Sequence, residues 1–169
     1  MNARHKHAEH SESVEAGKLR LTLRYAGNLL REIELGWGTG AGPDKALSSL
    51  GRAMQAALER YVCGQTPDWP ILPLDWESLT PYTRRTLEAL LENVPQGRTV
   101  SYGELAGMAG NPKGARATGR ALGANPWPLV VPCHRVVAAN GALTGFSSPC
   151  GLEMKRYLLD LEAGSRART

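Results

Sequence analysis

A thiol and an imidazole stand side by side in the apolar segment 130–137, whose sequence is VVPCHRVV. The other three histidines lie within the first ten residues, so His134 is the imidazole left for Cys133 in the folded part of the chain. A free thiol is only a few per cent thiolate at neutral pH, so a nucleophilic cysteine needs a base or a cation beside it. Adjacent strand residues point to opposite faces, and we therefore expect an irregular turn or a bridging water between the two side chains.

A carboxylate would be needed to orient the imidazole, and Glu162 is the candidate. It lies near the end of a predicted carboxy-terminal helix that follows the loop GFSSPCG. We expect the apolar face of that helix to hold the leucines at 152, 158, 159 and 161. A buried cysteine beside an interior histidine is also an ordinary core arrangement, and the CH pair alone favours that interpretation.

The three cysteines are odd in number and have no repeated spacing. This pattern predicts reduced thiols rather than a disulfide framework or a zinc ribbon. Cys63 is expected to be a packed residue at the end of a helix over 45–62.

Two short helices are predicted between residues 101 and 124. Ser101 and Glu104 have the spacing of a capping box, which starts a helix at Tyr102 that runs to about residue 109. After the turn GNPKG, the segment ARATGRALGA carries Arg116 and Arg120 on one face of a second helix. This is the outline of a helix-turn-helix, although an ordinary helical hairpin is the better interpretation when the outline stands alone. The small residues of the second helix suit the close approach of another backbone, such as DNA.

These elements predict an α/β chain, more narrowly α+β, with two domains. We expect a disordered tail over 1–17, an amino-terminal α+β domain with its linker over 18–78, and a mainly helical domain over 79–169. KLRLTLRY and REIELGW alternate as the strands of a β-hairpin or small sheet with one buried face. The proline-rich segment 64–78 reads as an extended linker, and Thr80 with Pro81 starts the next helix.

Charge and hydropathy narrow the class of protein. Residues 1–80 carry nine Lys and Arg against ten Asp and Glu, whereas residues 81–169 carry eleven against six. A basic second half suits a phosphate-rich partner and is equally compatible with a solvated surface. No segment has the length of a membrane span, and the first residues lack the apolar core of a secretory signal, so we expect a cytoplasmic protein.

Five sequence blocks occur in order between residues 80 and 164: SYGELA, GNPKGARATG, NPWPLVVP, PCHRV and a K..LL..E pattern that ends at Glu162. Together they resemble the O6-alkylguanine-DNA alkyltransferases, also called methylated-DNA–protein-cysteine methyltransferases. The resemblance implies one irreversible transfer of an alkyl group from O6-alkylguanine in double-stranded DNA, with O4-alkylthymine as a further candidate substrate. It implies a monomer that needs no cofactor. One cysteine in the amino-terminal domain and three histidines in the tail do not make a metal site, so we expect no metal either.

The resemblance also implies roles for individual residues. Cys133 would accept the alkyl group, and His134 with Glu162 would draw off its proton through a water. Tyr102 would crowd the target phosphate and donate toward the departing guanine, and Asn125 would hold the helix-turn-helix against the active-site segment.

The expected contacts with DNA and substrate come from the same resemblance. Arg116 would enter the duplex where the damaged base was, and the carbonyls of Cys133 and Val136 would recognise the guanine amino group. Ser147 would contact O6, and Lys155 would contribute to substrate binding. Further DNA contacts are expected from Ser101, Arg120 and Arg135.

Some features depart from the family pattern. Tyr82 and Thr83 stand where relatives often have Phe-Gln, which predicts looser packing of that helix. The loop GFSSPCG is longer than in many relatives, and its Cys150 has no assigned role. Three alternatives remain open at this point: a damage-binding protein without alkyl transfer, a sequence-specific transcription regulator, and a hydrolase of the Cys-His-Glu kind.

Overall fold

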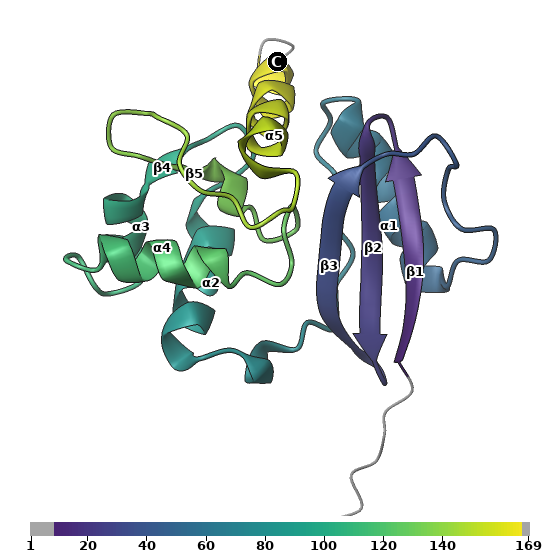
Figure 1. Cartoon of the computed structure of the whole chain (residues 1–169), viewed down its shortest axis with the longest axis horizontal. Coiled ribbons are helices and arrows are strands. Elements are labelled where there is room, and N and C mark those ends of the chain that lie inside the picture. Colours follow the sequence, from purple (N-terminus) through teal and green to yellow (C-terminus); the bar gives the residue numbers. More distant parts are fainter. Residues whose placement is uncertain (1–8, 167–169) are drawn as a thin grey trace, which may run out of the picture.

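Three antiparallel strands begin the computed structural model, which describes residues 9–166 (Figure 1). These strands are β1 (Glu9–Ala16), β2 (Leu19–Ala26) and β3 (Leu29–Trp37), and they lie in the order β1-β2-β3. The alternation predicted for β2 is confirmed, because one of its faces carries the buried residues Leu19, Leu21, Leu23 and Tyr25. Helix α1 (Ser49–Val62) packs against the sheet and contacts β1.

Strand β1 corrects the prediction of a disordered tail over 1–17. Residues 9–16 pair with β2 along their whole length, from Glu9 opposite Ala26 to Ala16 opposite Leu19. His10 belongs to this strand, and its ring stacks on Tyr25 with 4.6 Å between ring centroids. The other two histidines of the predicted tail, at positions 5 and 7, lie outside the described residues.

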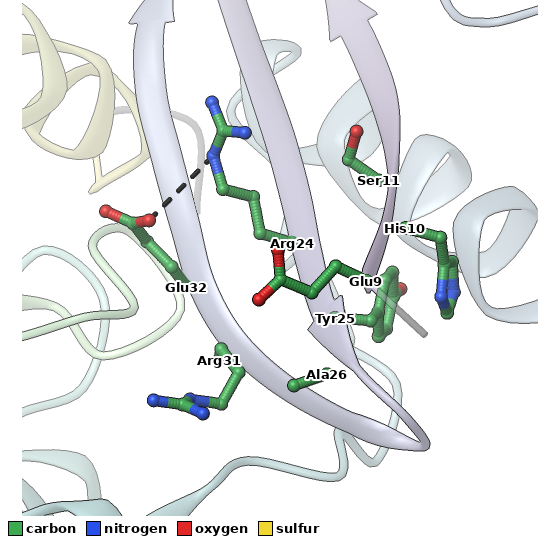
Figure 2. A pocket seen from close by; sticks show the side chains of 8 residues that line it. All are labelled: Glu9, His10, Ser11, Arg24, Tyr25, Ala26, Arg31 and Glu32. Carbon is green, nitrogen blue, oxygen red and sulfur yellow. Dashed lines mark ion pairs between the residues drawn. The ribbon is translucent and has the colours of Figure 1, made fainter. Parts of the chain in front are cut away.

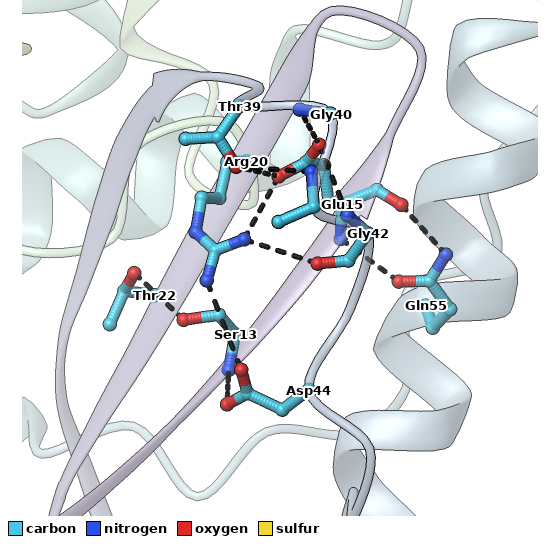
Figure 3. A network of polar contacts seen from close by, with 10 residues as sticks. Ser13, Glu15, Arg20, Thr22, Thr39, Gly40, Gly42, Asp44 and Gln55 are labelled. Carbon is cyan, nitrogen blue, oxygen red and sulfur yellow. Dashed lines mark hydrogen bonds and ion pairs between the residues drawn. The ribbon is translucent and has the colours of Figure 1, made fainter.

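Buried carboxylates explain how so polar a segment forms a strand. Glu15 accepts hydrogen bonds from Arg20 Nη1 at 2.9 Å, Thr39 Oγ1 at 3.1 Å and Gly40 N at 2.7 Å (Figure 3). These partners, with Arg20 foremost, lower the pKa of Glu15 to about 2. The charged form is therefore satisfied inside the fold, and the loop after β3 is fixed over this side of the sheet.

The predicted linker is extended along β3. Leu30 N donates to Pro73 O at 2.8 Å, and Leu30 forms an isolated parallel bridge with Leu74. A short 3₁₀ turn, η1 (Trp76–Ser78), then leads into the second domain.

The carboxy-terminal domain is mainly helical. It contains α2 (Pro81–Asn93), α3 (Tyr102–Met108), α4 (Ala115–Gly123) and α5 (Gly151–Arg166). Two residue pairs, β4 (Val100–Ser101) and β5 (Val136–Val137), form a small parallel ladder, and the 3₁₀ turn η2 (Cys133–Arg135) comes directly before β5. None of the helices within residues 9–166 is long and apolar enough to cross a bilayer.

Local signals placed the starts of α2 and α3 correctly, whereas α1 begins at Ser49 and not at residue 45. Thr80 caps α2 by accepting from Thr83 N, and Pro81 occupies the first turn. Ser101 and Glu104 form the complete capping box at the start of α3. The predicted looseness around Tyr82 is wrong, because its hydroxyl bonds to Thr118 Oγ1 of α4 at 3.0 Å and joins the two helices.

The two domains meet along β3. Trp127 is fully buried, and its Nε1 donates to Leu30 O at 3.0 Å. Ile33 N donates to Pro126 O at 2.8 Å, and Ser148 Oγ donates to Leu35 O at 2.9 Å. The segments on both sides of Cys133 are thereby bonded to the amino-terminal sheet.

Candidate active site

Cys133 opens the turn η2 rather than continuing a strand. Its backbone N donates to Val131 O at 2.8 Å, and Arg135 N donates to Pro132 O at 3.0 Å, so the chain is tightly curved here. The two neighbours diverge as a result. Cys133 lines a cavity, whereas His134 is fully buried on the side of α5. The prediction of an irregular turn in place of direct Cys–His contact is confirmed.

The cavity in front of the thiol measures about 330 Å³, within the range of roughly 300–1,000 Å³ that is typical of small-molecule pockets. It is bounded by α3, by α4, by η2 and by the loop before α5. Its lining residues are Tyr102, Gly119, Leu122, Gly123, Cys133, Gly145, Phe146 and Ser147. A Cβ on Gly119 would lie 3.8 Å from the ring of Tyr102, in ordinary van der Waals contact, so α3 and α4 adjoin beside the cavity.

The thiol is protonated in the resting site. Burial raises the pKa of Cys133, and hydrogen bonds from Asn125 and Ser147 together with the positive charge of Lys155 only partly oppose that effect. Ser147, which is predicted to contact O6, has its Oγ 3.9 Å from Sγ. The sulfur therefore needs a base when it reacts.

His134 and Glu162, the residues predicted to act as base and orienter, are in direct contact. His134 Nε2 lies 2.7 Å from Glu162 Oε1, and both side chains are essentially inaccessible to solvent. Burial lowers the pKa of His134 despite the carboxylate, so the ring is neutral at pH 7. Burial alone would raise the pKa of Glu162, but hydrogen bonds from His134 and Arg135 outweigh it and hold that pKa well below its usual range.

These protonation states fix the tautomer of the imidazole. An ionised carboxylate can only accept hydrogen bonds, so His134 Nε2 carries the proton and donates to Glu162. Nδ1 is then the basic nitrogen. It is buried and has no hydrogen-bond partner among the described residues. Nδ1 is therefore the ring atom that is able to take a proton.

Arg135 corrects a prediction, because its side chain lies inside the protein instead of at a DNA surface. Nε donates to Glu162 Oε2 at 2.9 Å and Nη2 donates to Oε1 at 3.0 Å. Nη1 donates to Val94 O at 2.8 Å, at the end of α2. All three side-chain nitrogens donate hydrogen bonds within the fold, and Arg135 is a buried partner of the Glu162 carboxylate.

Lys155 is also buried, and it contacts the backbone of the site. Nζ donates to the carbonyls of Val136 at 2.6 Å, Thr144 at 3.2 Å and Gly145 at 3.1 Å. The lysine thus joins β5 to the loop that forms one wall of the cavity. Among the carbonyls predicted to read the guanine, that of Val136 already accepts this bond.

The residues predicted around the helix-turn-helix are partly buried at the cavity or in the fold and partly exposed on α4. Tyr102 lines the cavity, and its hydroxyl donates to Thr144 O at 2.7 Å, whereas Ser101 is engaged in the capping box. Asn125 is buried directly after α4, where Nδ2 donates to Val131 O at 3.0 Å and Oδ1 accepts from Trp127 N at 3.0 Å. It therefore ties the end of α4 to the segment that leads to Cys133. Arg116 and Arg120 are exposed on α4.

Sequence reasoning missed Tyr61, whose hydroxyl donates to Glu162 Oε1 at 2.9 Å from the end of α1. No motif marks this tyrosine, and only the docking of the two domains brings it to the site. Cys63, two residues further on, does end α1 as predicted, but it is exposed rather than packed.

A second hollow, of about 390 Å³, lies on the amino-terminal sheet (Figure 2). Its lining residues are Glu9, His10, Ser11, Arg24, Tyr25, Ala26, Arg31 and Glu32, and Arg24 Nε lies 3.8 Å from Glu32 Oε2 across it. It has no cysteine in its lining and mixes both signs of charge. The cavity at Cys133, by contrast, has a thiol in its lining.

A cavity thiol beside a helix-turn-helix defines a class of protein that combines cysteine chemistry with a nucleic-acid-binding motif. A family model described as the 6-O-methylguanine DNA methyltransferase DNA-binding domain matches residues 81–164. A methylated-DNA–protein-cysteine methyltransferase of Methanosarcina acetivorans is 43% identical over 111 residues, 66% of this chain and 68% of the relative. One from Haemophilus influenzae is 41% identical over 109 residues, 64% of this chain and 59% of the relative.

Solved structures extend the likeness to nearly the whole chain. The O6-methylguanine methyltransferase of Mycobacterium tuberculosis is similar with a TM-score of 0.74 and 34% identity, over 94% of each chain. The structure of M. tuberculosis OGT in complex with DNA gives a TM-score of 0.74 over 90% of this chain and 92% of that one. The present chain therefore belongs to the methylated-DNA–protein-cysteine methyltransferase family.

Proposed function

We propose that the protein repairs O6-alkylguanine in double-stranded DNA by transferring the alkyl group, once and irreversibly, to Cys133. The observation that carries this proposal is the position of the thiol in the wall of a cavity between the helix-turn-helix and the loop 145–147. The M. tuberculosis relative in complex with DNA supports a nucleic-acid partner.

His134 activates the thiol through a water. In the reaction, the thiol proton passes to Nδ1 of the neutral ring, and the charge that forms on the ring is stabilised by Glu162 at 2.7 Å. The sulfur attacks the alkyl carbon, the carbon–O6 bond breaks, and the electron pair leaves with the purine. Tyr102 gives a proton to that leaving group, and the proton held by His134 then passes to the Tyr102 phenolate, so both residues return to their starting protonation states. The net change moves one proton from the thiol to guanine.

The lesion has to leave the base stack before the sulfur can reach it. Extruding a nucleotide costs a few kcal/mol of stacking and pairing free energy, and an inserted side chain offsets part of that loss. Arg116 is long, flat, cationic and exposed on α4, and it fills the vacated position in the duplex.

The walls of the cavity recognise the purine. The carbonyls of Cys133 and Val136 accept hydrogen bonds from the guanine amino group, and Ser147 contacts O6. Lys155 keeps the carbonyl of Val136 and the loop at Gly145 in fixed positions for this recognition. The product is a thioether that water does not cleave, so each protein acts once. In this proposal the protein acts as a monomer and without a cofactor.

Intact mass spectrometry with a duplex that contains O6-methylguanine tests the proposal. We expect one methylene equivalent of added mass on the peptide that holds Cys133, reaching a limit of one per protein. Cys133→Ser should gain no mass. Cys63→Ser and Cys150→Ser are matched controls for the other two thiols and should react as the unaltered protein does.

Other results would favour the competing functions. Tight binding of the lesion without added mass would indicate a damage sensor. High affinity for one undamaged sequence, unchanged by Cys133→Ser, would indicate a transcription regulator. Repeated turnover of an ester or amide that depends on Cys133 would indicate a hydrolase. Each of these outcomes would overturn the proposed repair reaction.

A further inference from the structure

The carboxylate of Glu162 accepts hydrogen bonds from both domains. Oε1 of Glu162 accepts from His134 Nε2 at 2.7 Å, Tyr61 Oη at 2.9 Å and Arg135 Nη2 at 3.0 Å. Oε2 accepts from Arg135 Nε at 2.9 Å and Gly97 N at 3.0 Å. Tyr61 is the donor in this set that comes from the amino-terminal domain, and it shares one oxygen with the imidazole.

Tyr61 is fixed in this position. It lies in the last turn of α1, is 1% exposed, and packs against the linker residue Trp69 with 6.0 Å between ring centroids. Burial, and then the charge of Glu162, raise the pKa of its hydroxyl far above the usual range. The hydroxyl therefore remains protonated and acts as a donor to the carboxylate.

We propose that Tyr61 is a positioning residue for the Glu162–His134 pair, through which the amino-terminal domain sets the basicity of the imidazole. This inference rests on the proposed function for its consequence in repair. The hydroxyl of Tyr61 donates to the same carboxylate oxygen of Glu162 as His134 Nε2–H does. Tyr61 therefore takes up part of the carboxylate charge that would otherwise stabilise the imidazolium. It also restricts the movement of Oε1 relative to the ring.

Several titratable or charged groups act on this pair. Those in hydrogen-bond contact with the carboxylate are Tyr61 from α1 and His134 and Arg135 from η2. At longer range, Lys155 of α5 acts on His134, and Tyr157 of α5 acts on Tyr61. The positive charges of Arg135 and Lys155 lower the pKa of the imidazole, and Glu162 raises it. Removing one competing donor from Glu162 should therefore raise the pKa of His134.

The test compares Tyr61→Phe with Tyr25→Phe. Both tyrosines are buried in the amino-terminal domain and donate to a carboxylate, but Tyr25 bonds to Glu12 at 3.0 Å, away from the relay. Ring titration of His134 by NMR in the DNA-free protein should show an upward pKa shift of about half a pH unit in Tyr61→Phe, as expected for the loss of one hydrogen bond. Tyr25→Phe should leave the titration unchanged.

The rate of Cys133 methylation should follow the same direction. The rate falls as pH falls through the pKa of the base, so a higher pKa of His134 moves this acidic limb to higher pH in Tyr61→Phe. In a Glu162→Gln background, the Tyr61→Phe substitution should produce no further shift.

The ring titration separates this inference from the repair reaction. If the protein does not accept an alkyl group but the His134 pKa moves as expected, the proposed function is wrong and the positioning role stands. If Tyr61→Phe and Tyr25→Phe give the same His134 pKa as the unaltered protein, the positioning role of Tyr61 is refuted, whatever the repair assay shows.

Discussion

Three consecutive residues in η2 serve the site in different directions. Cys133 faces the cavity, His134 faces Glu162, and Arg135 reaches both Glu162 and the end of α2. A 3₁₀ turn rotates successive side chains by about a third of a turn, so three adjacent positions can reach three different surroundings. One short turn therefore places the proposed nucleophile, its proposed base and the cation that holds the carboxylate.

Arg135 is expected to be a stability residue. Arg135→Ala leaves the buried carboxylate of Glu162 without its cation, and breaking a buried pair in this way typically costs about 3–5 kcal/mol. Urea unfolding should show a loss of this order in the free energy of unfolding. The matched control is Arg120→Ala on exposed α4, which should change stability by less than about 0.5 kcal/mol.

The opposite result for Arg135→Ala would support the original prediction that Arg135 contacts DNA. A stable Arg135→Ala protein with weakened DNA binding would show that the side chain can leave Glu162 and reach the duplex. Loss of stability in Arg120→Ala would show that α4 depends on more than its buried face.

For single residues, the sequence allowed the types of reactive side chain to be predicted better than the directions in which these side chains point. Cys133, His134 and Glu162 were identified by type, and the structure brings the last two into contact. Arg135 was misplaced because a single residue between a histidine and a strand carries no signal of which way it points. Tyr61 could not be identified, since its partner lies 101 residues away in the chain.

Among the elements, β1 shows why composition misled the prediction. The segment EHSESVEA has no apolar alternation, yet four of its central residues, 12–15, are buried. Glu12 is satisfied by Tyr25 Oη at 3.0 Å, Ser48 N at 2.8 Å and Ser48 Oγ at 2.7 Å, at the start of α1. A charged strand of this kind is stable only once its partners are folded around it, and those partners are distant in the sequence.

The inner face of the last helix was predicted only in part, for a related reason. Leu158 is buried as predicted and Leu152 is exposed, and the other buried positions described in α5 are Met154, Lys155 and Glu162. A pattern based on apolar residues cannot assign a lysine and a glutamate to the inner face. By contrast α2, α3 and the linker could be predicted, because caps, prolines and turns are local signals.

The contact between β1 and α1 makes a specific prediction for Gly51. An alanine inside a helix normally stabilises it by about 0.5–1 kcal/mol relative to glycine. At Gly51, however, a methyl group would collide with the carboxylate of Glu12, which is held by three hydrogen bonds. We therefore expect Gly51→Ala to lower the free energy of unfolding by about 1–3 kcal/mol, as overpacking does.

Gly107→Ala is the matched control, because Gly107 lies in α3 and a Cβ there would meet nothing within 4 Å. It should be neutral or stabilising in the same urea titration. Equal stabilisation by both substitutions would show that Glu12 moves aside at little cost.

For the whole molecule, the structure makes the amino-terminal domain a support for the site. The backbone of β3 bonds to residues 126, 127 and 148, on both sides of the active-site turn, and α1 supplies Tyr61. The charge, unlike these contacts, is concentrated in one half of the chain. The amino-terminal half is nearly neutral, and the excess of Lys and Arg lies in residues 81–169 with the helix-turn-helix.

This division predicts where salt will act on DNA binding. Each phosphate contact by a cation contributes about −0.9 to the slope of log affinity against log salt concentration. We expect a steep slope for an undamaged duplex, and Arg120→Ala should make it shallower by about 1. Arg52→Ala removes an exposed arginine from α1, on the other domain, and should leave the slope unchanged. Fluorescence anisotropy over a range of salt concentrations measures all three slopes. A flat dependence in the unaltered protein, or an equal effect of the two substitutions, would place the DNA contacts elsewhere than on the exposed face of α4.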